Sequence, residues 1–392
     1  MRVGIIYPYF FDPDGAELRI GGVETYLFQL TRLCADLGLD PIIFQSAKVP
    51  FARTLEHASV IGVTPKWPKR GCTRQRLFEA AVRTIELTKD ILIFGTDHFS
   101  VPVLSGRCVA IQHGVNWDLP AVRPSNRRWN EKGVAAAVWK SHLKRYASHA
   151  FRNCVNRVCV DYNFLNWYRA SFSAALPGNV WIIPNFAEIA QRDDLQQLDR
   201  SDTVKVLFAR RFTEYRGTRI MAEAARQLLA YNTTVAFTFA GEGPDSEWLK
   251  SAFAREPRVQ FVKFDSRDAV RVNAAHDIAV VPSLGSEGTS FSVAEAMGAG
   301  RAVIATNVGG ITNMIISGYN GILINPDAES LVCALKTLVD NHLYRRQLGM
   351  AAYETAKHAF SLARWRDDWK AVLRVLGTGH ANACGFATGG ES

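Results

Sequence analysis

Two glutamates, Glu287 and Glu295, frame a short stretch whose residue types and spacing suit the binding of a phosphate and a sugar. The sequence from 286 to 291 reads Ser-Glu-Gly-Thr-Ser-Phe, and an apolar-periodic helix is expected from about 290 to 297. A Gly and hydroxyl loop that opens a helix leaves free N–H groups at the positive end of the helix dipole, which attract an anion. Glu295 lies about two turns into this helix, where a carboxylate suits a ribose diol. An ordinary strand–helix–strand crossover with surface acids is the alternative interpretation.

The elements that must position this stretch alternate between strand and helix along the whole chain. The expected strands are 2–7, 41–45, 91–95, 107–112, 158–162 and 180–183 in the first half, and 204–209, 235–241, 259–264, 278–281 and 302–306 in the second. Expected helices include 77–87, 133–158, 221–229, 331–339 and 360–376. This alternation predicts an α/β fold of two doubly wound domains, in which ligands lie outside the carboxyl ends of the strands.

The stretch 286–310 resembles the donor-binding signature of the retaining glycosyltransferases of family 4, the glycosyl transferases group 1. That family has the GT-B architecture, two Rossmann-like domains facing a cleft with a C-terminal helix that crosses back to the first domain. The resemblance implies that Glu287 lies near the donor sugar and that Glu295 binds the nucleotide ribose. It places the donor diphosphate on the loop and helix start formed by Gly288, Thr289, Ser290 and Phe291.

A second motif, Arg210-Arg211-Phe212-Thr213-Glu214-Tyr215-Arg216-Gly217, is similar to the family's Gly-Arg-Leu-x-x-x-Lys-Gly, which supplies two cations for the diphosphate. In this alignment Arg211 and Arg216 are the two cations. Arg210 stands where Gly is usual, so it is expected to make no contact through its side chain. Arg216 replaces the usual Lys, and Asn313 replaces a usual acid after the Gly309-Gly310 turn. A basic surface turn is the alternative for this motif.

Three further resemblances concern glycine turns and one histidine. Gly21 and Gly22 are similar to the family loop that approaches the donor, although a Gly-Gly pair is also a common helix entry. His113, in Gln112-His113-Gly114, matches the histidine that contacts the donor sugar in the family. Gly241 matches the family's Gly-x-Gly turn. For His98, which follows the strand at 91–95, a structural role is expected.

The resemblance implies a retaining transfer of a sugar from a nucleoside diphosphate to a hydroxyl acceptor, with the departing phosphate oxygen taking the acceptor proton. Glu287, Arg211, Arg216 and His113 are the expected catalytic residues. No DxD-type metal motif lies beside the donor stretch, so neither a metal nor another cofactor is expected. The implied acceptor is a glycan or a lipid-linked glycan. The expected domains are 1–186 on the acceptor side, a linker at 187–202, a donor domain at 203–359, a crossover helix at 360–376 and a disordered tail at 377–392.

Composition limits the remaining function classes. The chain of 392 residues has a net charge of +9, and residues 123–157 hold nine basic residues against one acid. This segment could be a solvated face or a contact with an anionic membrane. Nucleic-acid binding is disfavoured because no known motif for it is present.

The seven cysteines are scattered, which favours reduced, buried thiols. The sequence shows no signal-like apolar segment and no apolar run long enough to span a membrane. A cytoplasmic protein is therefore expected, and in one alternative it is peripheral on a membrane. A non-catalytic protein that binds a sugar nucleotide or an anionic lipid on the same fold is the main alternative to an enzyme.

Overall fold

The computed structural model describes residues 1–19, 21–66, 72–115, 117–118, 133–172, 176–191 and 203–379. The chain divides into two compact units. Unit 1 comprises residues 1–113, 141–183 and 366–392, and unit 2 comprises residues 114–140 and 184–365. Each unit is built on one mainly parallel sheet, as the alternation of strands and helices predicted.

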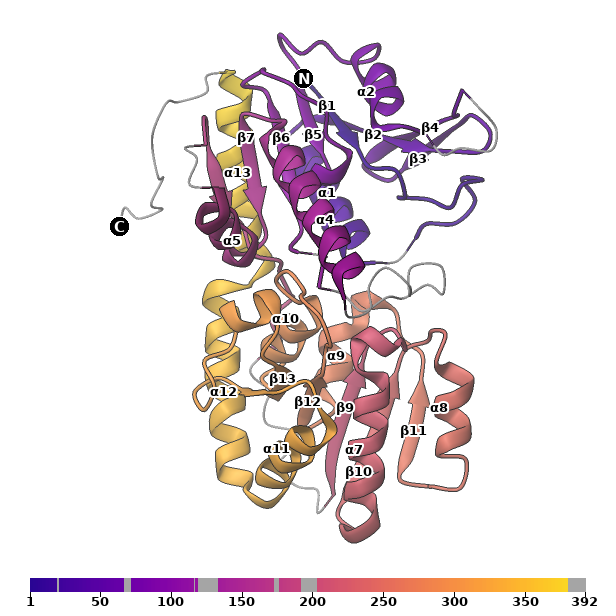
Figure 1. The fold of residues 1–392 in the computed structure, drawn as a ribbon, viewed down its shortest axis with the longest axis vertical. Helices are drawn as coiled ribbons and strands as arrows, with labels where there is room; N and C mark the ends of the chain where they lie inside the picture. Colours follow the sequence, from indigo (N-terminus) through magenta and orange to yellow (C-terminus); the bar gives the residue numbers. More distant parts are fainter. Residues whose placement is uncertain are drawn as a thin grey trace. The chain divides into compact units, whose positions relative to one another are not determined.

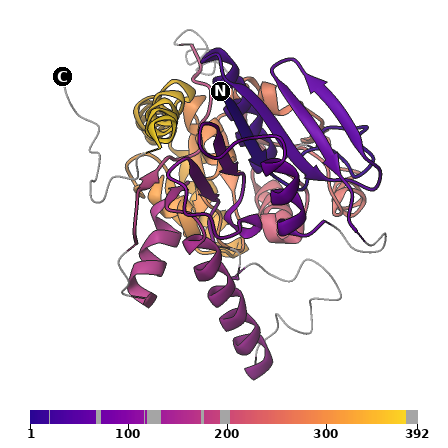
Figure 2. The same ribbon diagram turned by 90° about the horizontal axis from the view of Figure 1, so that it is seen from above.

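The sheet of unit 1 has the strand order β3-β4-β2-β1-β5-β6-β7-β8 (Figure 1). Its strands are β1 (Arg2–Ile6), β2 (Asp40–Ser46), β3 (Phe51–Leu55), β4 (Ala58–Val63), β5 (Ile91–Phe94), β6 (Cys108–Gln112), β7 (Asn156–Cys159) and β8 (Val180–Ile182). All neighbours are parallel except β3, which pairs antiparallel with β4 at the sheet edge (Figure 2). The central strands β5 and β6 are buried along their whole length, as expected of parallel strands covered on both faces.

The helices of unit 1 follow from their apolar spacing. Helix α1 (Gly22–Asp36) buries Tyr26, Leu27, Leu30 and Leu33, which recur at intervals of three and four residues. Helix α2 (Arg74–Val82) begins at Thr73, whose side chain accepts a hydrogen bond from the Arg76 N–H. Helices α4 (Val134–Arg152) and α5 (Tyr162–Phe172) complete the described α-helices that precede β8.

The sheet of unit 2 is parallel, with the order β11-β10-β9-β12-β13-β14. Its strands are β9 (Val204–Ala209), β10 (Val235–Ala240), β11 (Val259–Val262), β12 (Ile278–Val281), β13 (Ala302–Thr306) and β14 (Ile322–Ile324). Helices α7 (Thr218–Tyr231) and α11 (Ala328–Asp340) lie side by side on one face (Figure 1). Helices α10 (Phe291–Gly298) and α12 (His342–Ala359) cover the other face. In β12, Ile278 and Val280 belong to the hydrophobic core that includes α7 and α11, whereas Ala279 and Val281 belong to the core that includes α10 and α12. Successive side chains of this strand therefore point to opposite faces of the sheet. The short helices α8 (Ser246–Ala252) and α9 (Ala269–Ala274) follow β10 and β11.

The C-terminal helix α13 (Leu362–Thr378) begins in unit 2 and ends in unit 1, so the predicted crossing back to the first domain is confirmed. In unit 1 the Trp369 indole N–H donates to the Tyr26 hydroxyl at 2.6 Å, and Arg366 pairs with Asp36 at 2.5 Å. Most of the predicted tail, 380–392, lies outside the described residues, as does 192–202 of the predicted linker. The limits predicted for the domains stay predictions.

Several sequence expectations differ from the structure. The β3–β4 hairpin, β14 and α12 were not expected, and β7 begins two residues before the predicted strand. Cys333 is exposed, so the expectation that every thiol is buried is wrong for this residue. Arg157, one of the nine basic residues of segment 123–157, is not part of a basic surface. It is buried and donates to the carbonyl oxygens of Phe151 and Pro177 at 2.5 and 2.9 Å. In the part of the chain that the structure describes, no helix is long and apolar enough to cross a membrane.

Candidate functional site

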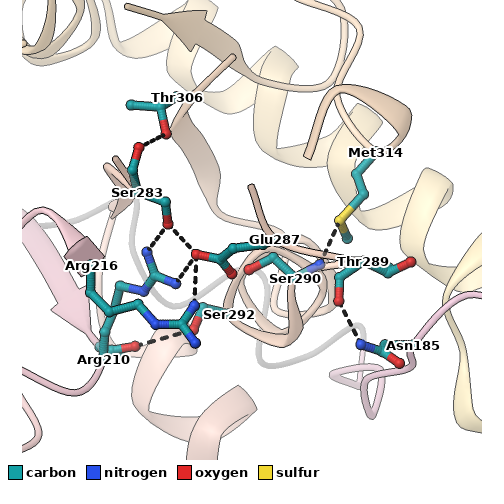
Figure 3. Close-up of polar contacts among 11 residues, drawn as sticks. Asn185, Arg210, Arg216, Ser283, Glu287, Thr289, Ser290, Ser292, Thr306 and Met314 are labelled. Atoms are coloured by element: carbon teal, nitrogen blue, oxygen red, sulfur yellow. Dashed lines mark hydrogen bonds and ion pairs between the residues drawn. The ribbon is translucent and has the colours of Figure 1, made fainter. Parts of the chain in front are cut away.

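The carboxylate of Glu287 is the centre of a compact charged cluster in unit 2 (Figure 3). Its Oε1 accepts a hydrogen bond from Arg210 Nη2 at 2.6 Å and pairs with Arg216 Nη1 at 2.7 Å. The Ser283 hydroxyl donates to the same oxygen, and Arg210 Nη1 donates to Ser283 Oγ at 2.6 Å. The side chain of Arg210 is only 3% exposed and that of Arg216 is 31% exposed, so one guanidinium is fixed inside while the other reaches solvent.

The charges of this cluster hold one another ionised. Burial by itself would raise the pKa of Glu287, but the guanidinium groups of Arg210 and Arg216 outweigh burial and hold that pKa well below its usual range. Burial lowers the pKa of Arg210 and Glu287 opposes the shift, while Glu287 raises the pKa of Arg216 above its usual range. A guanidinium keeps its proton in proteins, so both arginines stay cationic. Glu287 is therefore a carboxylate and is no proton donor at neutral pH.

The loop from β12 to α10 is fixed through its backbone. The Asn185 side chain donates to the Thr289 carbonyl oxygen at 2.6 Å, and the Gly310 N–H donates to the Glu287 carbonyl oxygen at 2.7 Å. Gly309 adopts a φ of +52°, and a Cβ on it would lie 2.6 Å from the Glu287 carbonyl oxygen, so the turn at 309–310 requires glycine.

Helix α10 begins at this loop, with Ser290 as its N-cap residue. The Ser290 hydroxyl is buried without a hydrogen-bond partner among the described residues, and the Ser290 N–H contacts the Met314 sulfur at 3.2 Å. A thioether is a weak acceptor, so this N–H can change partner readily. Phe291 packs edge-on against Phe186 with ring centroids 5.3 Å apart. The anion-binding role predicted for Gly288, Thr289 and Ser290 at this helix start stays a prediction.

Glu295 lies in the middle of α10 and is half-buried. Burial raises its pKa to about 7, and the opposing effect of the Arg210 charge is smaller. Its carboxyl group therefore changes charge near neutral pH, whereas Glu287 in the same segment does not. The two predicted donor-site acids have different electrostatic roles.

The structure places Arg210 rather than Arg211 beside Glu287. The expectation that position 210 makes no contact through its side chain is wrong, because Arg210 donates to both Ser283 and Glu287. Arg211 is exposed to solvent. Position 210 follows the last residue of β9, and its N–H bonds to the Ala240 carbonyl oxygen at 2.9 Å, which turns its side chain toward β12. Gly241 lies across from this residue, and a Cβ on Gly241 would collide with the Arg210 carbonyl oxygen.

In unit 1, His113 follows β6 and its Nε2 lies 2.8 Å from the Gly95 carbonyl oxygen. Burial lowers the pKa of His113, so the ring is neutral with its proton on Nε2. Nδ1 is then an acceptor, which suits a sugar hydroxyl. Gly21 is the N-cap residue of α1 and Gly22 its first residue. The Glu24 carboxylate in the first turn accepts a hydrogen bond from the Tyr7 hydroxyl at 2.7 Å.

Two residues of unit 2 that contact the donor loop were not expected. Ser283 joins the Arg210–Glu287 pair, although its position directly after β12 and Pro282 could have indicated a site role. Asp118 accepts hydrogen bonds from the Ser286 N–H, at 3.3 Å, and from the Ser286 hydroxyl. No sequence signal marked Asp118, because it lies in a segment without periodicity and far from 286 along the chain. Asn313, the departure from the family pattern, is exposed.

The structure thus combines two Rossmann-like sheets with, on the second, a loop at a helix start, two guanidinium groups and two carboxylates. Residues 203–341 match the family described as glycosyl transferases group 1. A phosphatidyl-myo-inositol mannosyltransferase of Mycolicibacterium smegmatis is 24% identical over 354 residues, covering 88% of this chain and 86% of that protein.

Solved structures agree on the architecture. The sucrose-phosphate synthase of Thermosynechococcus elongatus aligns with a TM-score of 0.72 at 17% identity, covering 97% of this chain and 100% of that chain. The Anabaena protein Alr3699/HepE in complex with UDP-glucose aligns with a TM-score of 0.68 at 18% identity, covering 96% and 100%. The GT-B fold is confirmed, and the match over residues 203–341 agrees with the predicted resemblance to the glycosyl transferases group 1.

Proposed function

We propose that this enzyme transfers a hexose from a nucleoside diphosphate sugar to a hydroxyl acceptor, with retention of configuration and without a metal ion. The observation that carries the proposal is the pair of guanidinium groups that converge on one oxygen of Glu287, at 2.6 and 2.7 Å, beside the start of α10. A diphosphate bound there would meet two cations and the positive end of a helix. The mannosyl transfer named for the mycobacterial relative and the UDP-glucose bound by the Anabaena protein support a hexose donor.

In the proposed reaction the bond between the sugar anomeric carbon and the diphosphate oxygen breaks, and its electron pair goes to the diphosphate. Arg210 and Arg216 stabilise that growing charge, together with the N–H groups at the start of α10. The acceptor oxygen attacks from the face that the leaving group departs from, and the departing phosphate oxygen takes the acceptor proton. We assign the inner cation to Arg210 because its side chain is fixed toward the donor loop, whereas Arg211 points to solvent.

Glu287 and Glu295 have different roles in the proposed mechanism. Glu287 is a permanent carboxylate that orients both arginines and is placed to accept hydroxyl protons of the sugar. Glu295 binds the ribose, since it lies about two turns from the phosphate-binding end of α10. His113 is the sugar contact that unit 1 contributes, through Nδ1 as an acceptor.

We further propose that the acceptor is a glycan or a lipid-linked glycan and that the protein contacts an anionic membrane peripherally. On α4, exposed Val134, Val138, His142, Arg145 and His149 recur at intervals of three and four residues, so they share one face. This face is apolar at its first turns and basic further on, which is typical of a helix at a membrane interface. The lipid named for the mycobacterial relative supports such an acceptor.

The test is a panel of UDP-, GDP-, ADP- and dTDP-hexoses, scored by calorimetric binding and then by release of the nucleoside diphosphate. One donor should bind and be hydrolysed slowly without an acceptor, and excess EDTA should leave that rate unchanged. Binding without hydrolysis or transfer would favour the non-catalytic sugar-nucleotide protein. Loss of turnover with EDTA, restored by a divalent cation, would refute the metal-free mechanism.

A further inference from the structure

The loop from β12 to α10, which carries Glu287, is contacted in unit 2 by a residue that lies far from it in the sequence. Asp118 and Ser286 are 168 residues apart in the chain, and both belong to unit 2. Asp118 accepts two hydrogen bonds from Ser286, one from the backbone N–H at 3.3 Å and one from the hydroxyl. Both hydrogen bonds end on the same oxygen, Oδ2. One carboxylate therefore fixes both the backbone and the side chain of the residue that directly precedes Glu287.

Gly114 contacts the residue that follows Glu287. A Cβ on Gly114 would lie 2.8 Å from the backbone nitrogen of Gly288 and 3.0 Å from the Gly288 Cα. Gly114 also adopts a φ of +105°, a conformation that residues with a Cβ rarely adopt. The close approach of these two backbones therefore requires glycine at position 114.

The turn that contains Gly309 holds the same stretch of backbone. A Cβ on Gly309 would lie 2.7 Å from the Glu287 backbone nitrogen and 2.7 Å from the Ser286 Cα. The backbone around Glu287 is thus fixed by this turn as well as by Gly114 and Asp118. Of these three contacts, that of Asp118 is made by a side chain, so it can be removed by substitution without straining the backbone.

The direction of the Glu287 side chain depends on the backbone that these contacts fix. Its Oε1 lies 2.6 Å from Arg210 Nη2 and 2.7 Å from Arg216 Nη1, so a rotation of the backbone at 286–287 would move the carboxylate away from both. A misplacement of about 1 Å that originates far from the reacting atoms can cost about 10²-fold in rate. A residue that fixes this backbone can therefore influence catalysis without contacting the reacting groups.

We propose that Asp118 is a positioning residue for the donor site, which holds Ser286 and, through it, the Glu287 carboxylate in the orientation that aligns the two arginines. This inference rests on the proposed function, since the alignment serves the charge that develops on a leaving diphosphate. Asp118 acts as a hydrogen-bond acceptor and makes no contact with the substrate. The amide of an asparagine can replace it, because one amide oxygen can accept both hydrogen bonds.

The experiment compares Asp118→Ala with Asp118→Asn in the full chain, by steady-state release of nucleoside diphosphate from the donor selected in the panel. Asp118→Ala should lower kcat by about three- to tenfold, the scale of one hydrogen bond, with a smaller change in KM, because the arginine contacts gain most in the transition state. Asp118→Asn should keep most of the turnover. Ser286→Ala removes only the hydroxyl contact, so it should have a smaller effect and should add nothing to Asp118→Ala.

The matched control is Asp327→Ala at the start of α11. Asp327 accepts hydrogen bonds from the Ser330 N–H at 2.7 Å and from the Ser330 hydroxyl at 3.1 Å, so it repeats the contact of Asp118 with the same residue types. Asp327→Ala should lower the urea midpoint and leave kcat unchanged well below the unfolding transition. If it lowers kcat as much as Asp118→Ala does, the effect is a general loss of stability and the proposal is overturned. The proposal also fails if Asp118→Asn loses as much turnover as Asp118→Ala.

Amide hydrogen exchange in peptides that cover 283–291 reports on the loop without any need for turnover. Exchange there should be faster in Asp118→Ala than in the wild type and unchanged in Asp118→Asn and Asp327→Ala. Unchanged exchange in Asp118→Ala overturns the positioning role, whatever the kinetics show. Failure of every nucleotide sugar to bind to the wild-type protein would instead refute the proposed function, and hydrogen exchange would then decide whether Asp118 positions the loop.

Discussion

The neighbouring arginines 210 and 211 offer a direct test of the donor site, because they differ in burial and contacts but share one loop. Arg210→Ala removes the bonds to Ser283 and Glu287 at 2.6 Å each. In the proposed mechanism Arg210 stabilises a charge that grows as the sugar leaves, so its loss should lower kcat more than it raises KM, by about 10²- to 10³-fold. Arg211→Ala should change kcat by less than about threefold, since that side chain lies in solvent.

Stability must be measured alongside turnover in these variants. Arg210→Ala leaves Glu287 buried with Arg216 and Ser283 as partners, so we expect a loss near the lower end of the range for a broken buried pair, about 3 kcal/mol. Urea denaturation measures that loss, and kinetics at a temperature well below the transition separate it from catalysis. Arg210→Lys keeps the charge but can reach only one of the two partners, so its kcat should be intermediate.

The assay is steady-state release of nucleoside diphosphate with the donor selected from the panel, over donor concentrations that span KM. If Arg211→Ala abolishes turnover while Arg210→Ala retains it, the assignment of the inner cation to Arg210 is refuted. If both variants turn over normally with an active donor, the charge-stabilising mechanism itself fails.

Four further expectations concern the same sites. Arg216→Lys restores the residue usual in the family and should retain much of the turnover that Arg216→Ala loses, as steady-state kinetics would show. Glu295→Ala should weaken UDP or GDP by about 1.5–3 kcal/mol in calorimetry, and an unchanged affinity would rule out the ribose assignment. The pKa of Glu295 is raised to about 7, and only the carboxylate accepts two hydroxyl groups, so nucleotide affinity should rise between about pH 6 and pH 8, and Glu295→Gln should flatten that profile. Stability should fall as the pH rises from 4.5 to about 7 and then level off, because in that window the folded state holds a proton that the unfolded state has lost. Liposome co-sedimentation should be strong with anionic lipid and fall with salt, and equal recovery on neutral liposomes would count against the α4 proposal.

The sequence predicted the elements whose apolar pattern is unambiguous. The limits of β9, β12 and β13 agree with the structure residue by residue, because each is a short apolar run bounded by polar or turn residues. The β3–β4 hairpin was missed since Phe51–Leu55 is mostly exposed and its alternation is weak. Helix α12 was missed because its apolar stripe, which includes Leu348, Ala352 and Ala356, is narrow and built partly of alanine.

The residue types of the candidate site could be predicted from the sequence, but the choice between Arg210 and Arg211 as the inward-pointing residue could not. The motif covers the loop whose arginines contact Glu287, yet spacing alone cannot show which of two adjacent arginines points inward, since that depends on the length of the turn. The last residue of β9 and the backbone bond from Arg210 to β10 decide that direction, and both are tertiary facts. Similarly, a Glu-x7-Glu spacing cannot show that one carboxylate is ionised by two arginines while the other is protonated near neutrality by burial.

The shared oxygen of Glu287 explains how two like charges can be held ready for a diphosphate. Two guanidinium groups within reach of one atom repel each other, and without a counter-ion the flexible Arg216 side chain would turn toward solvent. The carboxylate offsets that repulsion, and the bond from Ser283 fixes the carboxylate in turn. In the proposed mechanism these groups are placed before the substrate arrives, so little reorganisation would be needed when charge develops on the leaving diphosphate. In the proposed mechanism an arriving diphosphate would share the arginines with Glu287, which would moderate donor affinity. The transition state carries more charge on the leaving group, so it would gain most from both cations.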